Sequence, residues 1–441
     1  MSVPPSVPPN TGPLGVLRPA VTLVLLFGLT WLSFKGVAPT LAGGRLAVLV
    51  GFVLLTSSVA GSLAAEVGLP RITGFILVGI AAGPSLLGLL PGSAVEDLRL
   101  IDDFALALIA MLAGGELQVK NLRPQARVIA GTTAVITVVV ALGMAAAVVA
   151  VHPLVPFLDA LPWQGVVGVA LLLGVWSANS SPDLTVAVIE EAGAKGGLAE
   201  VILGITIVKD VVVIVLFTVT LALVTPLLDP TAGFSSHALV DLVREVGGAL
   251  VLGAAGGWVF SQYLGGKGRL RSPLATFLFA YVLVVLAQEL HVELLLTGVA
   301  AGFVIENLSP AGERMIQGIR SVAVVIFAFF FAIAGASLDL GAVIRFGPVA
   351  LVLFGVRVAL TRWGTRYGAR LTGADAEVTA RAWMGLISQG GVSLGLVLLI
   401  QDAFAEVGGG VVALAMAIII GNILGGPILL GRALAADEPR T

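Results

Sequence analysis

Two adjacent residues of opposite charge, Lys209 and Asp210, stand in the middle of an apolar segment. The segment ILGITIVKDVVVIVLFTV, residues 202–219, has the length and composition of a membrane-spanning helix apart from this pair. Asp210 lies about 12 residues into the expected helix, too deep for its side chain to reach either membrane surface. A carboxylate in such a place can bind either a proton or a metal cation, so the two ligands would compete for one site.

The neighbours of Asp210 on the same helix allow two interpretations. Thr206, one turn earlier on the same face, could add an oxygen ligand for a cation. Lys209 points about 100° away from Asp210 around the helix, so the two side chains need not pair with each other. The alternative is an ion pair that only fixes the packing of the helix.

The composition is that of a polytopic membrane protein. Hydrophobic residues make up 58% of the 441 residues, charged residues only 11%, and the mean hydropathy is +1.07. Apolar windows long enough to cross a bilayer recur along the chain, which predicts an all-α fold. Alternating strands of a β-barrel are absent, and the scattered basic residues exclude a nucleic-acid surface. The sequence has no cysteine, phosphate-binding loop, catalytic triad or His-rich metal motif, so neither an enzyme nor a cofactor is expected.

Hydropathy and turn residues predict about 14 transmembrane helices after a disordered N-terminus at 1–15. Lys and Arg concentrate in the loops that would be cytoplasmic if both termini were inside, which predicts that both termini lie in the cytoplasm. The expected helices span residues 16–34, 43–65, 72–90, 99–118, 127–151, 163–189, 198–227, 238–263, 272–289, 292–306, 317–338, 346–368, 380–401 and 408–431.

The sequence also repeats itself weakly. VGIAAG at 78–83 resembles TGVAAG at 297–302, and AMLAGGELQV at 110–119 resembles FAIAGASLDL at 331–340, with offsets of 219 and 221 residues. The copies start seven spans apart, an odd displacement, so they would have opposite orientations in the membrane. This predicts an extra N-terminal helix at 16–36, a first inverted six-helix repeat at 43–227, a linker helix at 238–263 and a second repeat at 272–431.

Corresponding helices of the two copies carry interruptions. The sixth expected span contains SANSSPD, residues 177–183, and the thirteenth contains ISQGGVSLG, residues 387–395. Proline and paired glycines weaken a helix, and the polar side chains can replace lost backbone hydrogen bonds. Each interruption alone could be a packing kink, but together they favour a binding site near the membrane midplane. The candidate residues are Asn179, Ser180, Ser181, Pro182 and Asp183 in the first, and Gln389, Gly390, Gly391 and Ser393 in the second.

These segments resemble the monovalent cation:proton antiporters, in particular the branch of bacterial Na+/H+ antiporters and Kef-type systems. The resemblance extends from Val48 to Gly431. It is carried by LPRITGFILVGIAAGPSLLGLL at 69–90, LAGGELQVKNLRP at 112–124 and SSPDLTVAVIEEAGAKGGLAEVILGITIVKD at 180–210. It implies two crossed broken helices in a core domain, helices 127–227 and 346–431. It also implies dimerisation helices at 43–118 and 272–338, and a homodimer that exchanges Na+ or K+ for protons by alternating access.

The resemblance also implies roles for single residues. Asp210 matches the family's essential aspartate, and Arg357 in LFGVRVALTRW matches the basic residue beside the broken pair, for which we expect an ion pair. Glu116 is a further candidate for a charge network. Lys209 departs from the family pattern, where aspartate, asparagine or glutamine is common. With one acid in the site, we hypothesise electroneutral, one-for-one exchange.

Two rival interpretations stay open at the level of sequence. An anion or organic-solute carrier on the same scaffold would use Lys209 and Arg357 to bind substrate charge, and a channel-like subunit would tolerate loss of Asp210. The sequence ends soon after the last expected helix, so no cytosolic nucleotide-binding domain is expected. The expected partners are the cation, the proton, membrane lipid and a second copy of the chain.

Overall fold

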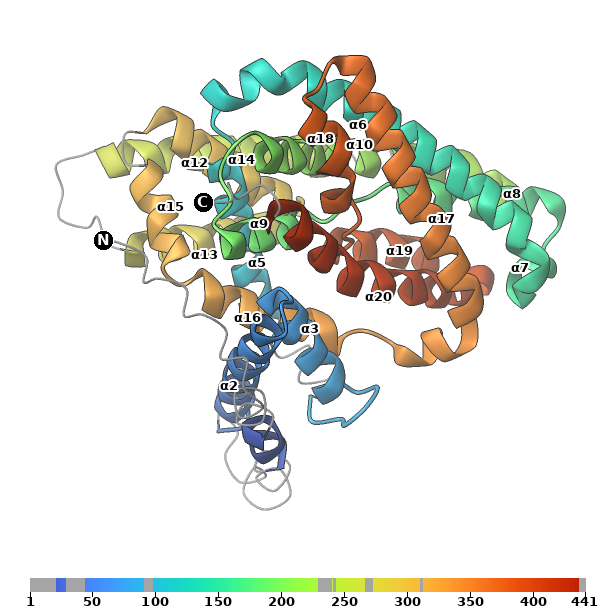
Figure 1. Cartoon of the computed structure of the whole chain (residues 1–441), viewed down its shortest axis with the longest axis horizontal. Coiled ribbons are helices and arrows are strands. Elements are labelled where there is room, and N and C mark those ends of the chain that lie inside the picture. Colours follow the sequence, from blue (N-terminus) through green and yellow to red (C-terminus); the bar gives the residue numbers. More distant parts are fainter. Residues whose placement is uncertain are drawn as a thin grey trace. The chain divides into compact units, whose positions relative to one another are not determined.

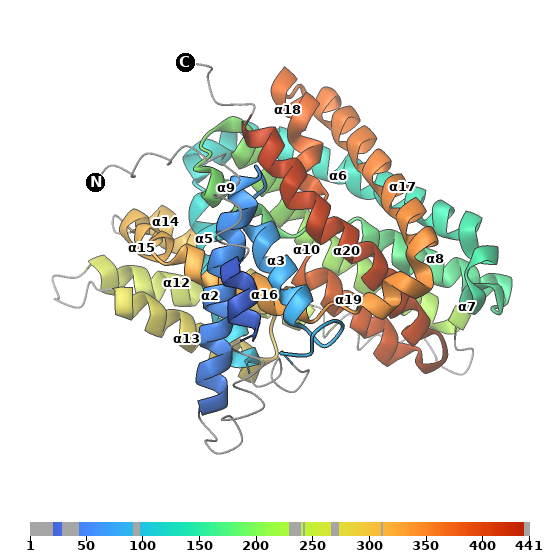
Figure 2. The same ribbon diagram turned by 60° about the horizontal axis from the view of Figure 1, so that its bottom comes forward.

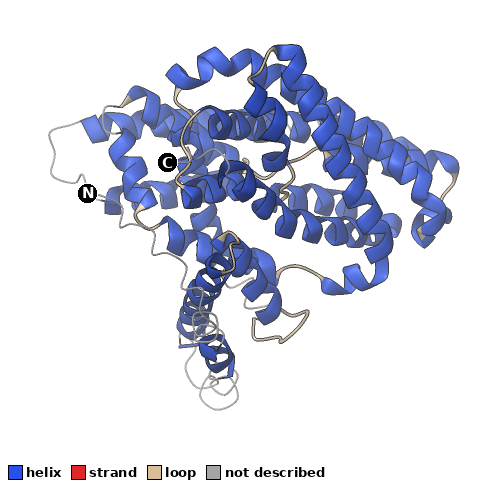
Figure 3. Cartoon of the chain, viewed as in Figure 1, coloured by secondary structure: helices blue, strands red, loops and turns tan. Residues whose placement is uncertain are grey.

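The described part of the protein is entirely helical. The computed structural model describes residues 21–28, 44–90, 98–228, 240, 243–265, 273–309 and 312–435, and within these ranges no strand occurs (Figures 1 and 3). The expected N-terminus at 1–15 lies outside the described residues. The α-helices are α2 (Gly44–Glu66), α3 (Arg71–Ala82), α5 (Arg99–Glu116), α6 (Val119–Val151), α7 (Pro156–Asp159), α8 (Trp163–Ser177), α9 (Pro182–Ala192), α10 (Gly197–Leu228), α12 (Gly248–Gly265), α13 (Pro273–Leu290), α14 (Leu294–Leu308), α15 (Gly312–Arg320), α16 (Ala323–Ala336), α17 (Leu340–Thr372), α18 (Ala376–Arg381), α19 (Gly391–Ala403) and α20 (Ala405–Ala435).

Many of these helices have the length and composition of membrane spans. Seven described helical segments meet both requirements, and the number becomes eight if α15 and α16 form one span. Shorter apolar helices, including α3 and α14, accompany them. The chain is therefore a multi-pass membrane protein, as predicted from its composition.

The chain divides into two compact units. One consists of residues up to Ala105 together with Ala323–Leu338, and the other of Leu106–Val322 and Asp339 onward. In the first unit α2, α3 and α16 pack on one another around an apolar core that includes Phe52, Leu90 and Phe329. Glycine brings two of these helices together, because a Cβ at Gly79 would lie 2.0 Å from the carbonyl oxygen of Ala332.

The second unit is built around two helices of 33 residues each, α6 and α17, which pack side by side in both views (Figures 1 and 2). α8 and α10 contact α6, and α20 contacts α17. A separate set of contacts joins α12 to α14, and Gly114 of α5 lies against the Val299 carbonyl of α14. This unit carries every candidate site residue.

Both long helices begin earlier than expected. α6 starts at Val119 instead of residue 127, and α17 starts at Leu340 instead of residue 346. Hydropathy marks only the part of a helix that suits the hydrocarbon, whereas the hydrogen-bonded helix continues into polar sequence such as VKNLRPQAR, 119–127. α3 ends at Ala82, shorter than expected, because Gly83 and Pro84 follow.

Candidate functional site

The first helix interruption lies between α8 and α9. α8 ends at Ser177, residues 178–181 are not α-helical, and α9 begins at Pro182. Proline suits the first position of a helix, because it has no N–H to leave unpaired there. Ser181 caps the new helix, with its Oγ accepting from the Leu184 N–H at 3.2 Å. The chain therefore presents a short, polar and buried stretch of backbone inside the helical unit.

The second interruption precedes α19. A short 3-10 helix, η4 (Ala382–Leu386), ends before residues 387–390, and α19 begins at Gly391. Gly390 is required there by close approach to the first interruption. A Cβ at this position would lie 2.6 Å from Ser181 Oγ and 2.9 Å from Asp183 Oδ2. A larger residue would displace the Ser181 and Asp183 side chains from their positions.

Hydrogen bonds join the two interruptions directly. The Ser181 N–H donates to the Ser388 carbonyl at 2.9 Å, and Asn179 Nδ2 donates to Ser393 Oγ at 3.1 Å. Trp176 Nε1 donates to the Ser393 carbonyl at 2.8 Å, and Gln389 Nε2 donates to the Trp176 carbonyl at 3.3 Å. Backbone groups freed by the breaks thus find partners in the opposite segment, as burial in an apolar medium requires.

Arg357 of α17 binds the free carbonyls of both segments. Its guanidinium donates to the carbonyls of Ser177, Asn179 and Ile387, each at 2.7 Å, and to Asn422 Oδ1 at 2.6 Å. The side chain is 1% exposed. The ion pair expected for Arg357 is absent from the described part of the chain. The reason is that carbonyls at helix ends carry partial negative charge and themselves hold the cation.

Lys209 also turns toward the first interruption and not toward a carboxylate. Its Nζ donates to Ser180 Oγ at 2.5 Å, and the Ser180 hydroxyl donates to the Leu386 carbonyl at 2.7 Å. Lys209 is 1% exposed, so its ammonium is enclosed by protein. The lysine of α10 is thereby connected through one serine to the second interruption.

Asp210 is an acid of the site without a close hydrogen-bond partner among the described residues; the Ser177 and Ser388 hydroxyls are unsatisfied as well. Asp210 is fully buried, and neither of its carboxylate oxygens has a hydrogen-bond partner among the described residues. Thr206 lies one turn earlier, and its hydroxyl donates to the Ile202 carbonyl at 2.8 Å, which leaves the oxygen lone pairs able to accept. Buried polar atoms are normally paired, so two free oxygens on one carboxylate indicate a ligand position.

Other polar groups act on Asp210 through space. They are the carboxylates of Asp183 and Glu293 and the ammonium of Lys209, and the side-chain amide of Asn179 lies within reach of a long hydrogen bond to Asp210. Asp183 lies in the first turn of α9, where its carboxylate accepts from Ser181 Oγ. Glu293 is the N-cap of α14 and accepts from the Leu296 N–H. Both of these neighbouring acids are thus held at helix N-termini, whereas Asp210 is free.

Glu116 belongs to a separate charge cluster. Arg320 donates to Glu116 and, at 2.8 Å, to Glu190. A cavity of about 240 Å³ beside this cluster is lined by further charged residues, including Lys195 and Glu200. Glu116 therefore forms an ion pair with Arg320 of α15, and its expected role in a charge network of the core stays a prediction.

Comparison with known proteins identifies the family. The model of the family "sodium/hydrogen exchanger, transmembrane" matches residues 52–435. The chain belongs to this family. The Na+/H+-K+ antiporter GerN of Bacillus cereus is 23% identical over 379 residues, which cover 81% of this exchanger chain and 90% of GerN. The family resemblance seen in the sequence is confirmed.

Solved structures share the fold of this exchanger chain. The sodium proton antiporter MjNhaP1 of Methanocaldococcus jannaschii at pH 8 superposes with a TM-score of 0.66 and 18% identity, covering 89% of this chain and 96% of that one. An electron-microscopy structure of MjNhaP1 superposes with a TM-score of 0.65 and 17% sequence identity. The match covers 89% of this chain and 98% of that one. The all-helical antiporter fold is thereby established.

Sequence reasoning missed several groups of the site in this exchanger. Asn422 of α20 links Arg357 to Gln389, whose Oε1 accepts from Asn422 Nδ2 at 2.8 Å. A lone asparagine in the apolar segment AIIIGNILGG was the available signal. Glu293 gave no signal, because it follows a helix end and resembles a solvated loop acid.

Proposed function

We propose that this exchanger binds a monovalent cation, Na+ or K+, and a proton in turn at Asp210. The observation that carries the proposal is a fully buried carboxylate whose two oxygens have no partner among the described residues. A proton or a cation would satisfy the same oxygens, so binding of one excludes the other. Thr206, Asn179, Ser180 and Ser181 are the neighbouring oxygen-bearing residues from which further cation ligands would come.

Alternating access is supported by the internal repeat. α6 and α17 start 221 residues apart and have the same length, and the interruptions at 178–181 and 387–390 occupy corresponding places after them. The repeated glycines also make corresponding contacts. Gly79 and Gly335 lie in the contact of α3 with α16, whereas Gly298 and Gly114 lie in the contact of α14 with α5. We infer two inverted repeats within about 14 spans, with cytoplasmic termini and a homodimeric assembly of inner-membrane protein.

The contacts of the two buried cations argue against a carrier of anions. Arg357 uses its donors on three carbonyls and one amide oxygen, and Lys209 donates to Ser180. An anionic substrate at Arg357 would have to displace buried hydrogen bonds, at about 1.5–3 kcal/mol for each one broken. The charged group of the site without a close partner is the acid Asp210, which suits a cation.

The proposal is tested with purified protein in liposomes that contain a trapped pH dye. Addition of Na+, Li+ or K+ outside is expected to drive protons out of the vesicles, and choline is expected to have no effect. An oxonol dye in parallel vesicles is expected to stay flat, because one carboxylate exchanges one cation for one proton. A dye response to choline would contradict cation exchange, and an oxonol response would contradict electroneutrality.

Lys209→Gln tests whether the lysine takes part in the stoichiometry. Glutamine can still donate to Ser180 Oγ but carries no charge. Because only Asp210 alternates between proton and cation, we expect the variant to remain electroneutral in the oxonol measurement. A membrane potential generated by wild type during Na+-driven proton flux, and lost in this variant, would show that Lys209 itself carries a proton through the cycle.

A further inference from the structure

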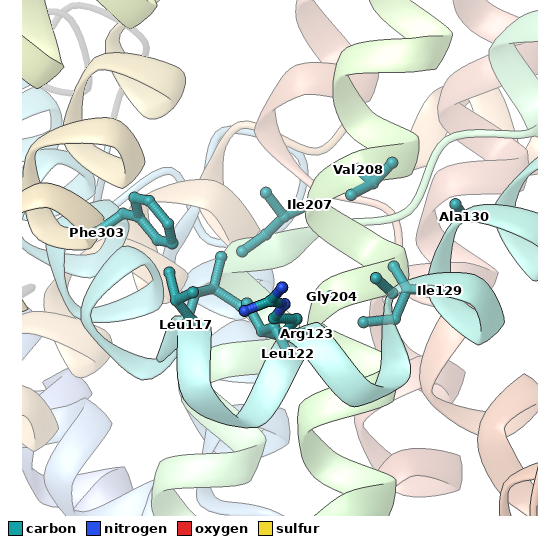
Figure 4. Close-up of a pocket in the computed structure, with 11 residues that line it drawn as sticks. Leu117, Leu122, Arg123, Ile129, Ala130, Gly204, Ile207, Val208 and Phe303 are labelled. Atoms are coloured by element: carbon teal, nitrogen blue, oxygen red, sulfur yellow. The ribbon is translucent and has the colours of Figure 1, made fainter. Parts of the chain in front are cut away.

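An apolar groove opens beside the helix that carries Asp210. It has a volume of about 400 Å³ and lies between the start of α6, the inner part of α10 and α14 (Figure 4). Apolar side chains form almost all of its surface. They include Leu117, Leu122, Ile129, Ile207, Val208 and Phe303. Val208 is 40% exposed, so the groove is open along one side.

One cation lies at this groove. Arg123 lines the groove together with Leu122 and Gly204 (Figure 4), and Arg123 has no hydrogen bond or ion pair with a described residue. Lys120 and Arg127 stand three residues before and four residues after it on α6, which places all three on one face of the helix. All three residues are exposed. The groove thus combines an apolar wall with a cluster of exposed positive charge.

The length of α6 places this charge at the membrane surface. A helix of 33 residues is about 50 Å long, whereas the hydrocarbon core is about 30 Å thick. The stretch without charged residues starts at Val128, so residues 119–127 extend into the headgroup layer. Ile129 and Val208 then line the groove at the depth of the acyl chains.

We propose that this groove binds an anionic phospholipid. One acyl chain would lie along the apolar wall, and the phosphate would bind Arg123 with help from Lys120 and Arg127. A polar solute would find no partners on the wall, and a free acyl chain would not use the three cations. The bound lipid would contact Ile207 and Val208 of α10, one turn or less from Asp210, and so lie against the helix of the exchange site.

Native mass spectrometry of the delipidated, detergent-solubilised full chain tests this site. The probes are phosphatidylglycerol, phosphatidylcholine with the same acyl chains, and inorganic phosphate. Each basic residue near an anionic headgroup contributes about 1 kcal/mol to the free energy of binding. Phosphatidylglycerol is therefore expected to bind at least about 5-fold more tightly than phosphatidylcholine. Arg123→Gln is expected to weaken phosphatidylglycerol binding about 5-fold. The control Arg432→Gln, at an exposed arginine of α20, is expected to leave this affinity unchanged.

A second variant tests the apolar wall without changing charge. Ala130 is exposed and lines the groove, so Ala130→Phe fills the groove without crowding the core. It is expected to abolish the binding that Arg123→Gln weakens. Equal phosphatidylglycerol binding by wild type and Ala130→Phe would overturn the proposal. Competition by inorganic phosphate that Ala130→Phe leaves intact would also overturn it, because it would indicate an ion site and not a lipid site.

Discussion

Asp210→Asn is expected to reduce cation-driven proton flux to that of protein-free liposomes while leaving the protein folded. Asparagine has nearly the same shape but can neither take up a proton nor offer negative charge to a cation. Asp210 is fully buried and its oxygens are not used in holding the structure together. Burial of a neutral amide costs less than burial of an unpaired carboxylate, so the unfolding midpoint in detergent is expected to equal or exceed that of wild type.

Binding can be separated from transport by thermal unfolding in the presence of Na+ or choline. A ligand that binds only the folded state at ten times its Kd stabilises that state by about 1.4 kcal/mol. Wild type is expected to be more stable to heat in Na+ than in choline by about this amount, and Asp210→Asn is expected to have the same stability in both. Asp375→Asn, an exposed aspartate before α18, is the matched control and retains both the increase and the flux. Wild-type flux in Asp210→Asn would remove Asp210 from the exchange site.

Features of the site that depend on local sequence could be predicted from it. Pro182 ends one helix and starts another whatever surrounds it, and paired glycines at 390 and 391 weaken a helix through the backbone itself. Asp210 was recognisable for a similar reason, because a carboxylate is costly at that depth in any apolar helix. These signals act within a few residues and need no knowledge of the fold.

The partners of the charged residues could not be predicted, because they come from distant segments. Arg357 binds carbonyls at Ser177, Asn179 and Ile387, and every residue type has a carbonyl, so no sequence pattern marks them. The partner of Lys209 is the Ser180 hydroxyl, 29 residues away in the sequence, which comes close only in the folded chain. Glu293 could not be predicted as a neighbour of Asp210 for the same reason, because the two residues come together only through the packing of the helices.

Arg357→Lys is expected to lower the free energy of unfolding by about 2–4 kcal/mol and to reduce exchange strongly. The guanidinium reaches four acceptors from two interruptions and from Asn422 at 2.6–2.7 Å. A lysine keeps the charge, but its single nitrogen is shorter in reach and lacks the planar arrangement of donors. At least one buried carbonyl would lose its partner, at about 1–3 kcal/mol for each such group.

The measurement is equilibrium unfolding in mixed micelles, with Arg370→Lys as the matched control. Arg370 lies in the last turn of the same helix and is exposed, so this substitution is expected to change stability by no more than about 0.5 kcal/mol. If charge alone held the two interruptions together, Arg357→Lys would be as stable as Arg370→Lys. A much lower stability of Arg357→Lys would show that the directed hydrogen bonds of the guanidinium hold them. The positions of Asn179 and Ser180 beside Asp210 then depend on a residue that touches neither ion.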